Sequence, residues 1–280
     1  MASGNATAAS WESVSSTVQT WARPALTHAA RCWFAVTVAG QLMFAAYIAS
    51  LYGGAALRSD FAAWNRVMTH GHIDGAHAGN IATGVHLLGA AVIMLSGALQ
   101  LLPWLRIRTP SVHRWNGRMY LGAAVTASLT GIYMVWWRGA VGGTVQHLGT
   151  TLNGVLVLLF AGMALQRIRA RKVEAHRRWA LRLFLAVSGV WFFRIGVMFW
   201  LAINHGPVGF DPRTFEGPFL SFLAFAQYAV PLAILELYFL CRARGGAVAH
   251  LGMACLLAGA TMAMAIAIVV ATAGMWLPNM

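Results

Sequence analysis

Seven apolar stretches, each about twenty residues long, set the strongest limit on what this chain can fold into. A helix of that length crosses the hydrocarbon core of a bilayer, about 30 Å thick, at a rise of about 1.5 Å per residue. Lipid offers no partner for backbone N–H and C=O groups, so a stretch that crosses it must be helical or part of a closed barrel. Only 10% of the residues are charged, against about 25% in soluble domains. We therefore predict an all-α polytopic membrane protein with seven transmembrane helices. The predicted helices cover residues 32–55, 81–104, 116–137, 147–166, 179–203, 218–241 and 251–277.

The chain carries 20 Lys and Arg against 7 Asp and Glu, and the basic residues gather in alternate connections between the predicted helices. Most of them fall in residues 106–118, 167–182 and 242–244. By the positive-inside rule these connections face the cytoplasm, so the N-terminus is predicted inside and the C-terminus outside a bacterial inner membrane. The net charge of +13 is then explained by orientation and by contact with lipid headgroups, and we expect no nucleic-acid partner.

No linker divides the apolar part of the chain. Residues 1–31 are rich in Ala, Ser and Thr and are predicted to form a polar cytoplasmic tail, not a cleavable signal peptide. Residues 32–280 are predicted to form a single seven-helix transmembrane domain. The three cysteines show no metal-binding or disulfide spacing, so cysteine chemistry is not expected.

Two stretches inside this domain resemble each other, and each has a histidine at both ends. The first stretch runs from His86 to His113 and the second from His147 to His176, so the two histidine spacings are nearly equal. Each stretch spans one predicted helix and the entrance of the next, so residues 81–203 form a duplicated two-helix hairpin with a four-helix core. Both hairpins start on the same side of the membrane, which makes the repeat a parallel one.

Equivalent positions of such a repeat lie at matching depth, which defines two pairs of histidines. We call His86 and His147 the outer pair, and His113 and His176 the inner pair. Two imidazoles on opposite sides of one flat ring are the ligands of a bis-histidine haem. The layout is similar to that of the ascorbate-dependent transmembrane di-haem cytochromes b, whose haems are held by histidines on the same alternation of four central helices. This similarity predicts one or two haem b groups that carry electrons across the bilayer, from a cytoplasmic or quinone donor to an outer acceptor. Histidines near helix ends also serve only as caps or headgroup contacts, and that alternative stays open.

Residues 82–194 resemble a bacterial family of predicted membrane proteins, domain of unknown function 2306. The resemblance implies a membrane protein with no assigned activity, and it favours the inner pair because the position of His147 is not regularly histidine in the family pattern. It rests on His86, Leu99-Gln100, His113-Arg114-Trp115-Asn116-Gly117-Arg118, Ala175-His176-Arg177-Arg178-Trp179 and Arg194.

Three arginines are candidate partners of haem propionates. Arg194 lies about five helical turns beyond the second inner histidine, about 27 Å along a continuous helix, which places it near the level of the outer pair. Its planar fork suits a carboxylate, and the alternative is a structural hydrogen bond to a helix carbonyl or to Gln227. Arg114 and Arg118 follow the first inner histidine, where propionates would offset the repulsion between their charge and an oxidised haem.

Arg182 and Glu236 are each predicted to lie a few residues inside the cytoplasmic ends of neighbouring helices. A buried ion pair between them would tie the two helices together. The alternative is that Glu236 carries protons, since an acid inside a membrane helix is costly and commonly functional.

Four potential metal ligands crowd into the first outer loop: His70, His72, Asp74 and His77. Imidazole and carboxylate groups suit zinc, copper or iron, and a metal ion held there could be reduced by an outer haem. Loops rich in His and Gly also occur without metal, so both interpretations are kept.

The sequence therefore favours an integral inner-membrane haem b protein that transfers electrons and has no catalytic residue of its own. The first alternative is a membrane transporter, or a protein that binds small molecules or lipid, with a polar cavity lined by His and Arg. The second is an accessory membrane subunit with a structural role. The paired depth of four histidines on alternating helices separates the first hypothesis from the other two.

Overall fold

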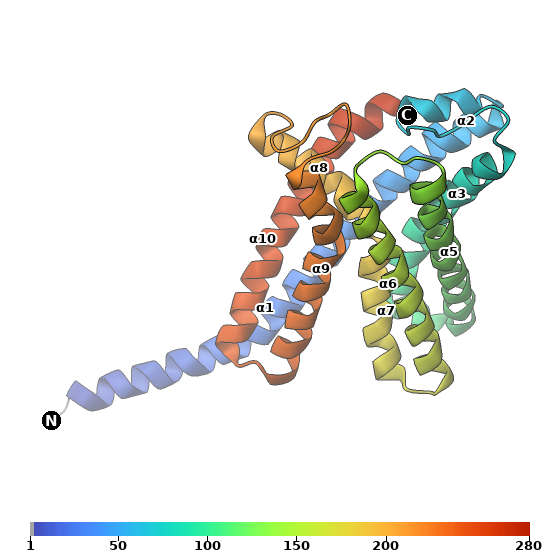
Figure 1. The fold of residues 1–280 in the computed structure, drawn as a ribbon. Coiled ribbons are helices and arrows are strands. Elements are labelled where there is room, and N and C mark those ends of the chain that lie inside the picture. Colours follow the sequence, from blue (N-terminus) through green and yellow to red (C-terminus); the bar gives the residue numbers. More distant parts are fainter. Residues whose placement is uncertain (1–2) are drawn as a thin grey trace. The chain divides into compact units, whose positions relative to one another are not determined.

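A computed structural model describes residues 3–280, with side chains from residue 20 onward, and its regular structure is helical (Figure 1). One isolated bridge pair, Asp211 with Glu216, is the exception within these residues. Six helices are long and apolar enough to cross a membrane, or seven if one bent pair counts as a single span. The prediction of an all-α polytopic membrane protein is confirmed.

The helix boundaries follow the predicted spans closely, with proline or glycine at several starts. Pro103, Pro110 and Pro218 each open a helix, where a missing N–H costs nothing. Gly142, at a positive φ of 97°, lies in the turn that precedes α6. The long helices are α1 (Ser3–Ile48), α3 (His77–Gln100), α5 (Pro110–Trp137), α6 (Thr144–Arg169), α7 (Val173–Val187), α8 (Gly189–Asn204), α9 (Pro218–Arg244) and α10 (Ala247–Ala271). The short elements are α2 (Gly54–Leu57), α4 (Pro103–Arg108), the π-helices η1 (Ala49–Gly53) and η3 (Thr272–Trp276), and the 3₁₀-helices η2 (Phe61–Arg66) and η4 (Leu277–Asn279).

The chain divides into two compact units, and three helices pass from one to the other. Unit 1 holds residues 1–37 and 233–266, and unit 2 holds residues 38–232 and 267–280. In unit 1, Leu26 of α1 packs against Met253, Ala254 and Leu257 of α10. The boundary predicted at residue 31 falls inside α1, which is helical from Ser3.

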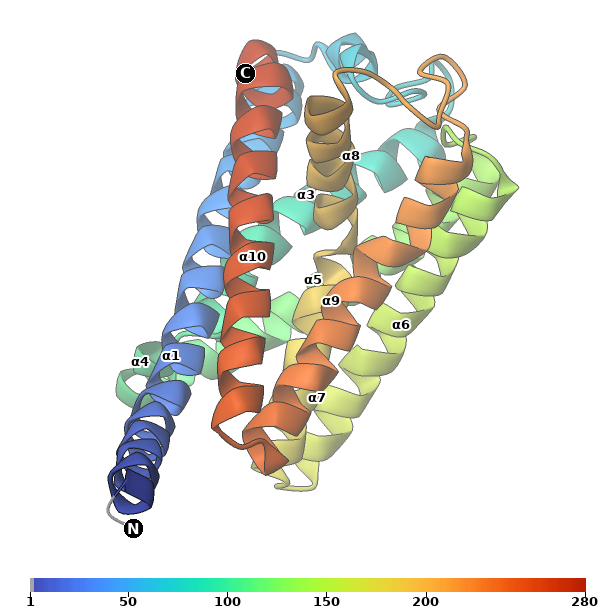
Figure 2. The same cartoon turned by 90° about the vertical axis from the view of Figure 1, so that its left-hand side faces the viewer.

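Unit 2 contains the duplicated hairpins, which form a closed ring of four helices. Helix α3 packs along α5, α5 along α6, and α6 along α7 (Figures 1 and 2). Phe184 of α7 closes the ring, because a Cβ on Gly97 of α3 would lie 3.4 Å from its ring. Helices α3 and α6 therefore stand diagonally opposite each other, as do α5 and α7.

The fifth predicted span is the one clear departure from expectation. The sequence predicts a single helix over residues 179–203, and that prediction is wrong: α7 ends at Val187, α8 begins at Gly189, and the two helices are bent by 47°. The Ser188 hydroxyl donates to the carbonyl of Phe184 at 2.7 Å and accepts from Nε2 of Gln41 at 2.9 Å. Side-chain hydrogen bonds of this kind compete with the backbone ladder at a helix break. The straight path assumed between His176 and Arg194 therefore does not exist.

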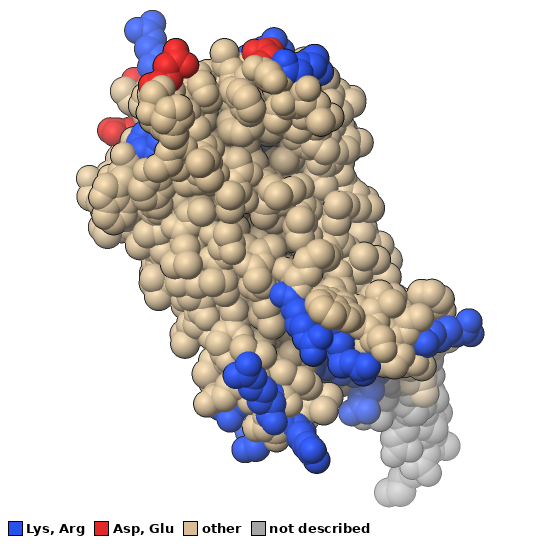
Figure 3. All heavy atoms as spheres, turned by 90° about the vertical axis from the view of Figure 1, so that its right-hand side faces the viewer, with Lys and Arg blue, Asp and Glu red and all other residues tan. Residues whose placement is uncertain are grey.

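The two ends of unit 2 differ in charge. The connections from α3 to α5 and from α6 to α7 carry the Arg-rich segments, and we call this end the basic end. The opposite end, formed by residues 58–76, 138–143 and 205–217, we call the loop end. Figure 3 shows Lys and Arg side chains at both ends, whereas the acidic side chains visible in that view lie at one end, together with some of the basic ones.

Candidate functional site

The outer pair lies on the diagonal helices α3 and α6, in the half of the ring nearer the loop end. Nδ1 of His86 donates to the carbonyl of Ala127 on α5 at 2.9 Å and lies 3.2 Å from the hydroxyl of Thr130. Since Nδ1 carries the proton, the lone pair is on Nε2. His147 has the opposite arrangement, because its Nε2 donates to the carbonyl of Ala140 at 3.2 Å. No hydrogen bond joins the two histidines in the described part of the chain.

The inner pair lies on the other diagonal, at the basic end. Nε2 of His113 is 3.3 Å from Nε2 of Gln100, and an amide nitrogen can only donate, so the His113 lone pair is on Nε2. The orientation of the Gln100 amide is fixed by Asn116, whose Nδ2 donates to Gln100 Oε1 at 2.9 Å. Asn116 is itself anchored by donating to the carbonyl of Ser96 at 2.8 Å. A chain of neutral hydrogen bonds therefore positions the first inner histidine.

The second inner histidine is positioned by the backbone of α6. Nδ1 of His176 donates to the carbonyl of Ala164 at 2.9 Å, which leaves the lone pair on Nε2. His176 and His113 each lie in the first turn of their helices, α7 and α5, at the basic end of the ring. The structure therefore places both inner histidines at one end of the ring.

Three of the four histidines have the tautomer that binds a metal through Nε2: His86, His113 and His176. Ligating histidines almost always donate the other N–H to a carbonyl, carboxylate or water, as His86 and His176 do here. The donor at Nδ1 of His113 is buried without a partner, and so is the hydroxyl of Tyr120 two turns further along α5. Both histidines of the inner pair thus have the lone pair on Nε2 that would bind a haem iron. The outer pair has this arrangement only if the His147 ring rotates and its Nε2 leaves the carbonyl of Ala140.

Arg114 and Arg118 lie on the exposed side of α5. Arg114 donates to the hydroxyl of Ser111 at 3.1 Å, and the guanidinium carbon of Arg118 stands 5.1 Å from the centre of the Trp115 ring. Both side chains are exposed, and their predicted contact with propionates stays a prediction.

Arg194 lies one and a half turns into α8, in an interior lined by aromatic rings. Its guanidinium carbon is 5.6 Å from the centre of the Phe44 ring, and its charge acts on both His86 and Tyr47. Its Nε is buried without a hydrogen-bond partner, and no ion pair joins it to an acid of the described chain. The predicted proximity to the outer pair is met at His86, by way of the bent helix and not along a straight one. Gln227, the alternative partner, instead donates to the carbonyl of Ala224 at 2.8 Å.

Around Arg194, two π-helices bring further polar groups into the interior. The rings of Tyr47 and Tyr52 are 6.1 Å apart, and Tyr47 stacks on Trp276 at 6.5 Å. The two hydroxyls interact with each other, and the Trp276 indole nitrogen is buried without a partner. Tyr52 and Trp276 belong to η1 and η3, and π-helices are frequent at functional sites. Hydropathy gave no sign of this cluster, because π-helices have no sequence signature that separates them from α-helix.

The four predicted metal ligands of the outer loop do not converge. His70 is directed to the carbonyl of Gly139 at 2.9 Å, and His72 is 3.6 Å from the exposed carboxylate of Asp74. His77 opens α3. No group of three or more His, Cys, Asp and Glu suited to a metal ion occurs in the described residues, so the metal site stays a prediction without support from the geometry.

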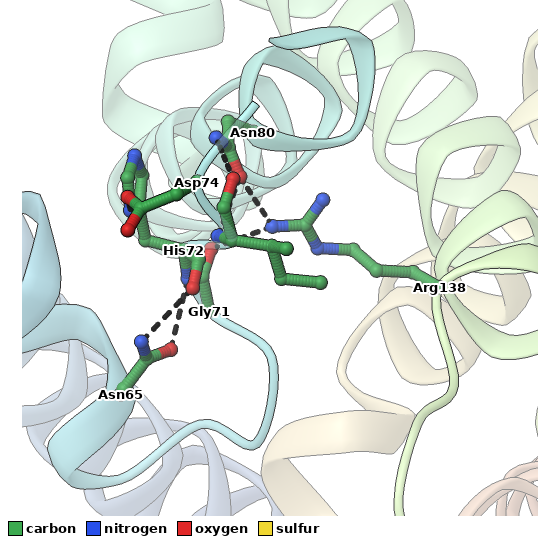
Figure 4. A network of polar contacts seen from close by, with 7 residues as sticks. Asn65, Gly71, His72, Asp74, Asn80 and Arg138 are labelled. Carbon is green, nitrogen blue, oxygen red and sulfur yellow. Dashed lines mark hydrogen bonds and ion pairs between the residues drawn. The ribbon is translucent and has the colours of Figure 1, made fainter. Parts of the chain in front are cut away.

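The backbone of this loop is organised by Arg138, which the sequence did not single out. Figure 4 shows its side chain reaching from the end of α5 into the loop. Its Nε donates to the carbonyl of His70 at 2.8 Å, and its Nη2 donates to the carbonyl of Gly71 at 3.1 Å and to Oδ1 of Asn80 at 2.6 Å. The only sequence signal was an arginine directly after the aromatic end of a predicted span.

The predicted ion pair between Arg182 and Glu236 would join residues of different units. Arg182 lies in unit 2, with its guanidinium carbon 4.6 Å from the centre of the Trp179 ring, and Glu236 lies in unit 1. The pair stays a prediction.

Comparison with known proteins gives one match. Residues 83–213 match the model of a family described as Predicted membrane protein (DUF2306), which confirms the resemblance proposed from the sequence. The matched segment covers α3 to α8 and all four histidines, and the family description assigns no activity. No curated protein and no solved structure matches the chain.

Proposed function

Starting from a family of membrane proteins with no assigned activity, we propose that this protein is a haem b electron carrier. The observation that carries the proposal is the placement of His113 and His176 on diagonal helices of one closed ring. The two imidazoles lie at the same end of the ring, and both have their lone pair on Nε2. Axial ligation of a haem from two sides requires this combination.

Each residue near the inner pair has a definite part in this proposal. His113 and His176 would be the axial ligands, and the bond from His176 to the carbonyl of Ala164 would fix the ring orientation. Gln100 would release Nε2 of His113 when a ligand takes the lone pair. The unpartnered hydroxyl of Tyr120 would donate to an acceptor at the edge of the bound group. A haem bound there supplies a one-electron iron couple, and the protein supplies position and electrostatics.

A second haem at the outer pair belongs to the same proposal, on weaker support. His86 is already oriented for it, and the nearby charge of Arg194 would meet a propionate. Electrons would then pass between the two ends of the ring, with a quinone or another small molecule as donor. By the positive-inside rule, the basic end would face the cytoplasm of the inner membrane.

The first experiment is an absorption spectrum of the detergent-purified full-length protein, oxidised and reduced, with haem quantified per chain. The proposal predicts b-type bands and at least one haem per chain when the protein is made in haem-replete cells. A folded but colourless protein from such cells would contradict it.

One observation favours a second candidate, a membrane protein that binds or transports a small anionic molecule. Membrane helices broken near their middle commonly line substrate sites in transporters. Here the break at Ser188 lies shortly before a half-buried arginine, Arg194, whose Nε is buried and which has no acid partner in the described chain. This candidate predicts that a haem-free preparation is stabilised by organic anions, and that Arg194→Met abolishes the stabilisation. A shift that is identical in wild type and variant would contradict it.

A further inference from the structure

A cavity at the loop end of unit 2 lies apart from the four histidines. It has a volume of about 420 Å³. Two aromatic rings form part of its wall: Tyr133 and Trp137 stack with centres 6.1 Å apart and planes inclined by 10°. Its wall residues are Ile73, Gly75, Ala76, His77, Ala78, Gly79, Tyr133, Trp137 and Arg138.

The charged group in this wall, Arg138, is only 8% exposed, and its visible partners are all neutral. Its three hydrogen bonds go to two backbone carbonyls and one amide oxygen, and Figure 4 shows the bonds to Gly71 and Asn80. No ion pair joins it to an acid in the part of the chain that the structure describes. Burial lowers the pKa of the Arg138 guanidinium from its ordinary value, but arginine keeps its charge in proteins. A buried cation with only neutral partners leaves a positive charge uncompensated.

One nitrogen of this guanidinium remains available. The described hydrogen bonds use Nε and Nη2, whereas Nη1 lies at the position that a Cβ on Gly79 would take. Gly79 also lines the cavity. Because glycine has no side chain, Nη1 of Arg138 can reach the cavity at this position. The nearest acid along the loop, Asp74, is exposed and directed to His72 at 3.6 Å.

We propose that this cavity is a binding site for an oxyanion, a phosphate or carboxylate group, held by Nη1 of Arg138. Guanidinium forms short, charge-assisted bonds with such groups. The bonds to the loop carbonyls hold the guanidinium in place before a ligand arrives, so little side-chain entropy is lost on binding. Since a water takes about 30 Å³ of liquid volume, the cavity has room for an oxyanion together with several waters.

The same chemistry has two sources at this position. Gly79 lies in the first turn of α3 and Trp137 at the last residue of α5, so the cavity lies where two candidate membrane spans end. A lipid phosphate would reach it from the headgroup layer, and a small soluble anion would reach it from the aqueous side.

The test measures the thermal unfolding midpoint of the full-length protein in a phosphate-free detergent. Inorganic phosphate is titrated at constant ionic strength in one arm. Phosphatidylglycerol is titrated in the other, with diacylglycerol as the lipid control that lacks the phosphate. A ligand that binds only the folded state raises the midpoint saturably. We expect this rise in at least one arm.

Two variants and a matched control assign the rise to the cavity. Arg138→Gln should raise the half-saturating concentration about tenfold or more, the loss expected for one charge-assisted bond. Ala78→Phe should do the same by filling the cavity while leaving the three loop bonds of Arg138 in place, so it decides the matter if Arg138→Gln fails to fold. Arg66→Gln removes the same charge from an exposed position of the same end and should behave as wild type.

The outcomes separate the two sources. A rise with phosphate that depends on Arg138 identifies a soluble anion, and a rise with phosphatidylglycerol alone identifies a lipid headgroup. No saturable rise in either arm, or rises that both cavity variants leave unchanged, would overturn the proposal.

Discussion

In the first hairpin of the ring the returning helix, α5, runs unbroken from Pro110 to Trp137, whereas in the second hairpin it is divided into α7 and α8 at Ser188. Both returning helices begin alike, with an inner histidine in the first turn and an Arg beside it. The backbones of the hairpins diverge at Ser188, twelve residues beyond His176. The two hairpins therefore have histidines at equivalent positions at the basic end, but their surroundings differ at the loop end.

The divergence is clearest at one pair of equivalent residues. Gly131 follows His113 at the same interval along the chain as Arg194 follows His176. Both are next to His86: a Cβ on Gly131 would lie 3.1 Å from its Cε1, and the charge of Arg194 acts on it. The first hairpin therefore leaves space beside the His86 imidazole, and the second places a positive charge near it. The two copies therefore share the inner histidine and differ 18 residues further on, where the first has glycine and the second arginine.

The largest expected effect tests how tightly the second hairpin is packed. A Cβ on Gly149 would lie 3.0 Å from the backbone oxygen of Ala224, whereas a Cβ on Gly89 would have ordinary contacts, the Ala127 Cβ at 3.4 Å and the backbone oxygen of Ala123 at 3.6 Å. Backbone atoms cannot move aside, so Gly149→Ala should lower the free energy of unfolding by about 2–3 kcal/mol. Gly89→Ala, the matched control in the first hairpin, should change it by no more than about 0.5 kcal/mol. Unfolding of both variants in mixed micelles measures the difference, and equal losses would show that the hairpins are packed alike.

The helix break provides the next test. Ser188→Ala removes the acceptor of Gln41 and leaves a buried amide unsatisfied, which should cost about 1–2 kcal/mol of unfolding free energy. Replacing both partners, as in Gln41→Leu with Ser188→Ala, should cost less than the sum of the single changes. A double variant whose loss equals that sum would rule out the coupling between the two side chains.

Removing the buried charge should act in the opposite direction. Arg194→Met replaces a buried, unpartnered Nε with apolar atoms, so the haem-free protein should gain about 1 kcal/mol of stability. The spectrum of the inner haem should not change. A loss of stability in the haem-free protein would mean that Arg194 has a protein partner that holds the bend together.

The smallest effect is expected on the exposed side of α5. Arg118→Gln removes a charge whose described contact is the Trp115 ring, so the unfolding free energy should change by no more than about 0.5 kcal/mol. Haem content per chain should stay at the wild-type value. A fall in haem content would restore Arg118 to the cofactor site, where the sequence had placed it.

Hydropathy and charge were enough to predict the transmembrane helices, because the bilayer imposes their length and composition. The repeat of histidine spacings was enough to predict the pairing of helices in the ring. The break at Ser188 was missed because residues 179–203 are mostly apolar and contain no proline. It depends on a hydrogen bond from Gln41, 147 residues away in the chain, which no local pattern reveals.

The site was predictable to a similar depth. The sequence placed His113 and His176 at the same end of the four-helix ring, because matching depth follows from counting residues along helices, and their role as ligands stays a prediction. It could not reveal which ring nitrogen each histidine uses, because Ala127, Ala140 and Ala164 take part through backbone carbonyls. The loop contacts of Arg138 were hidden for the same reason, since two of its three acceptors are carbonyls.

The most direct test of the inner haem is the haem content per chain of His113→Ala and His176→Ala, purified beside the exposed-histidine control His28→Ala. The account predicts that the two variants lose the same haem, with equal stoichiometry and identical residual spectra, while the control keeps the wild-type content. If one of the two variants keeps the wild-type haem content and spectrum, the two histidines do not ligate one group, and the central claim is contradicted.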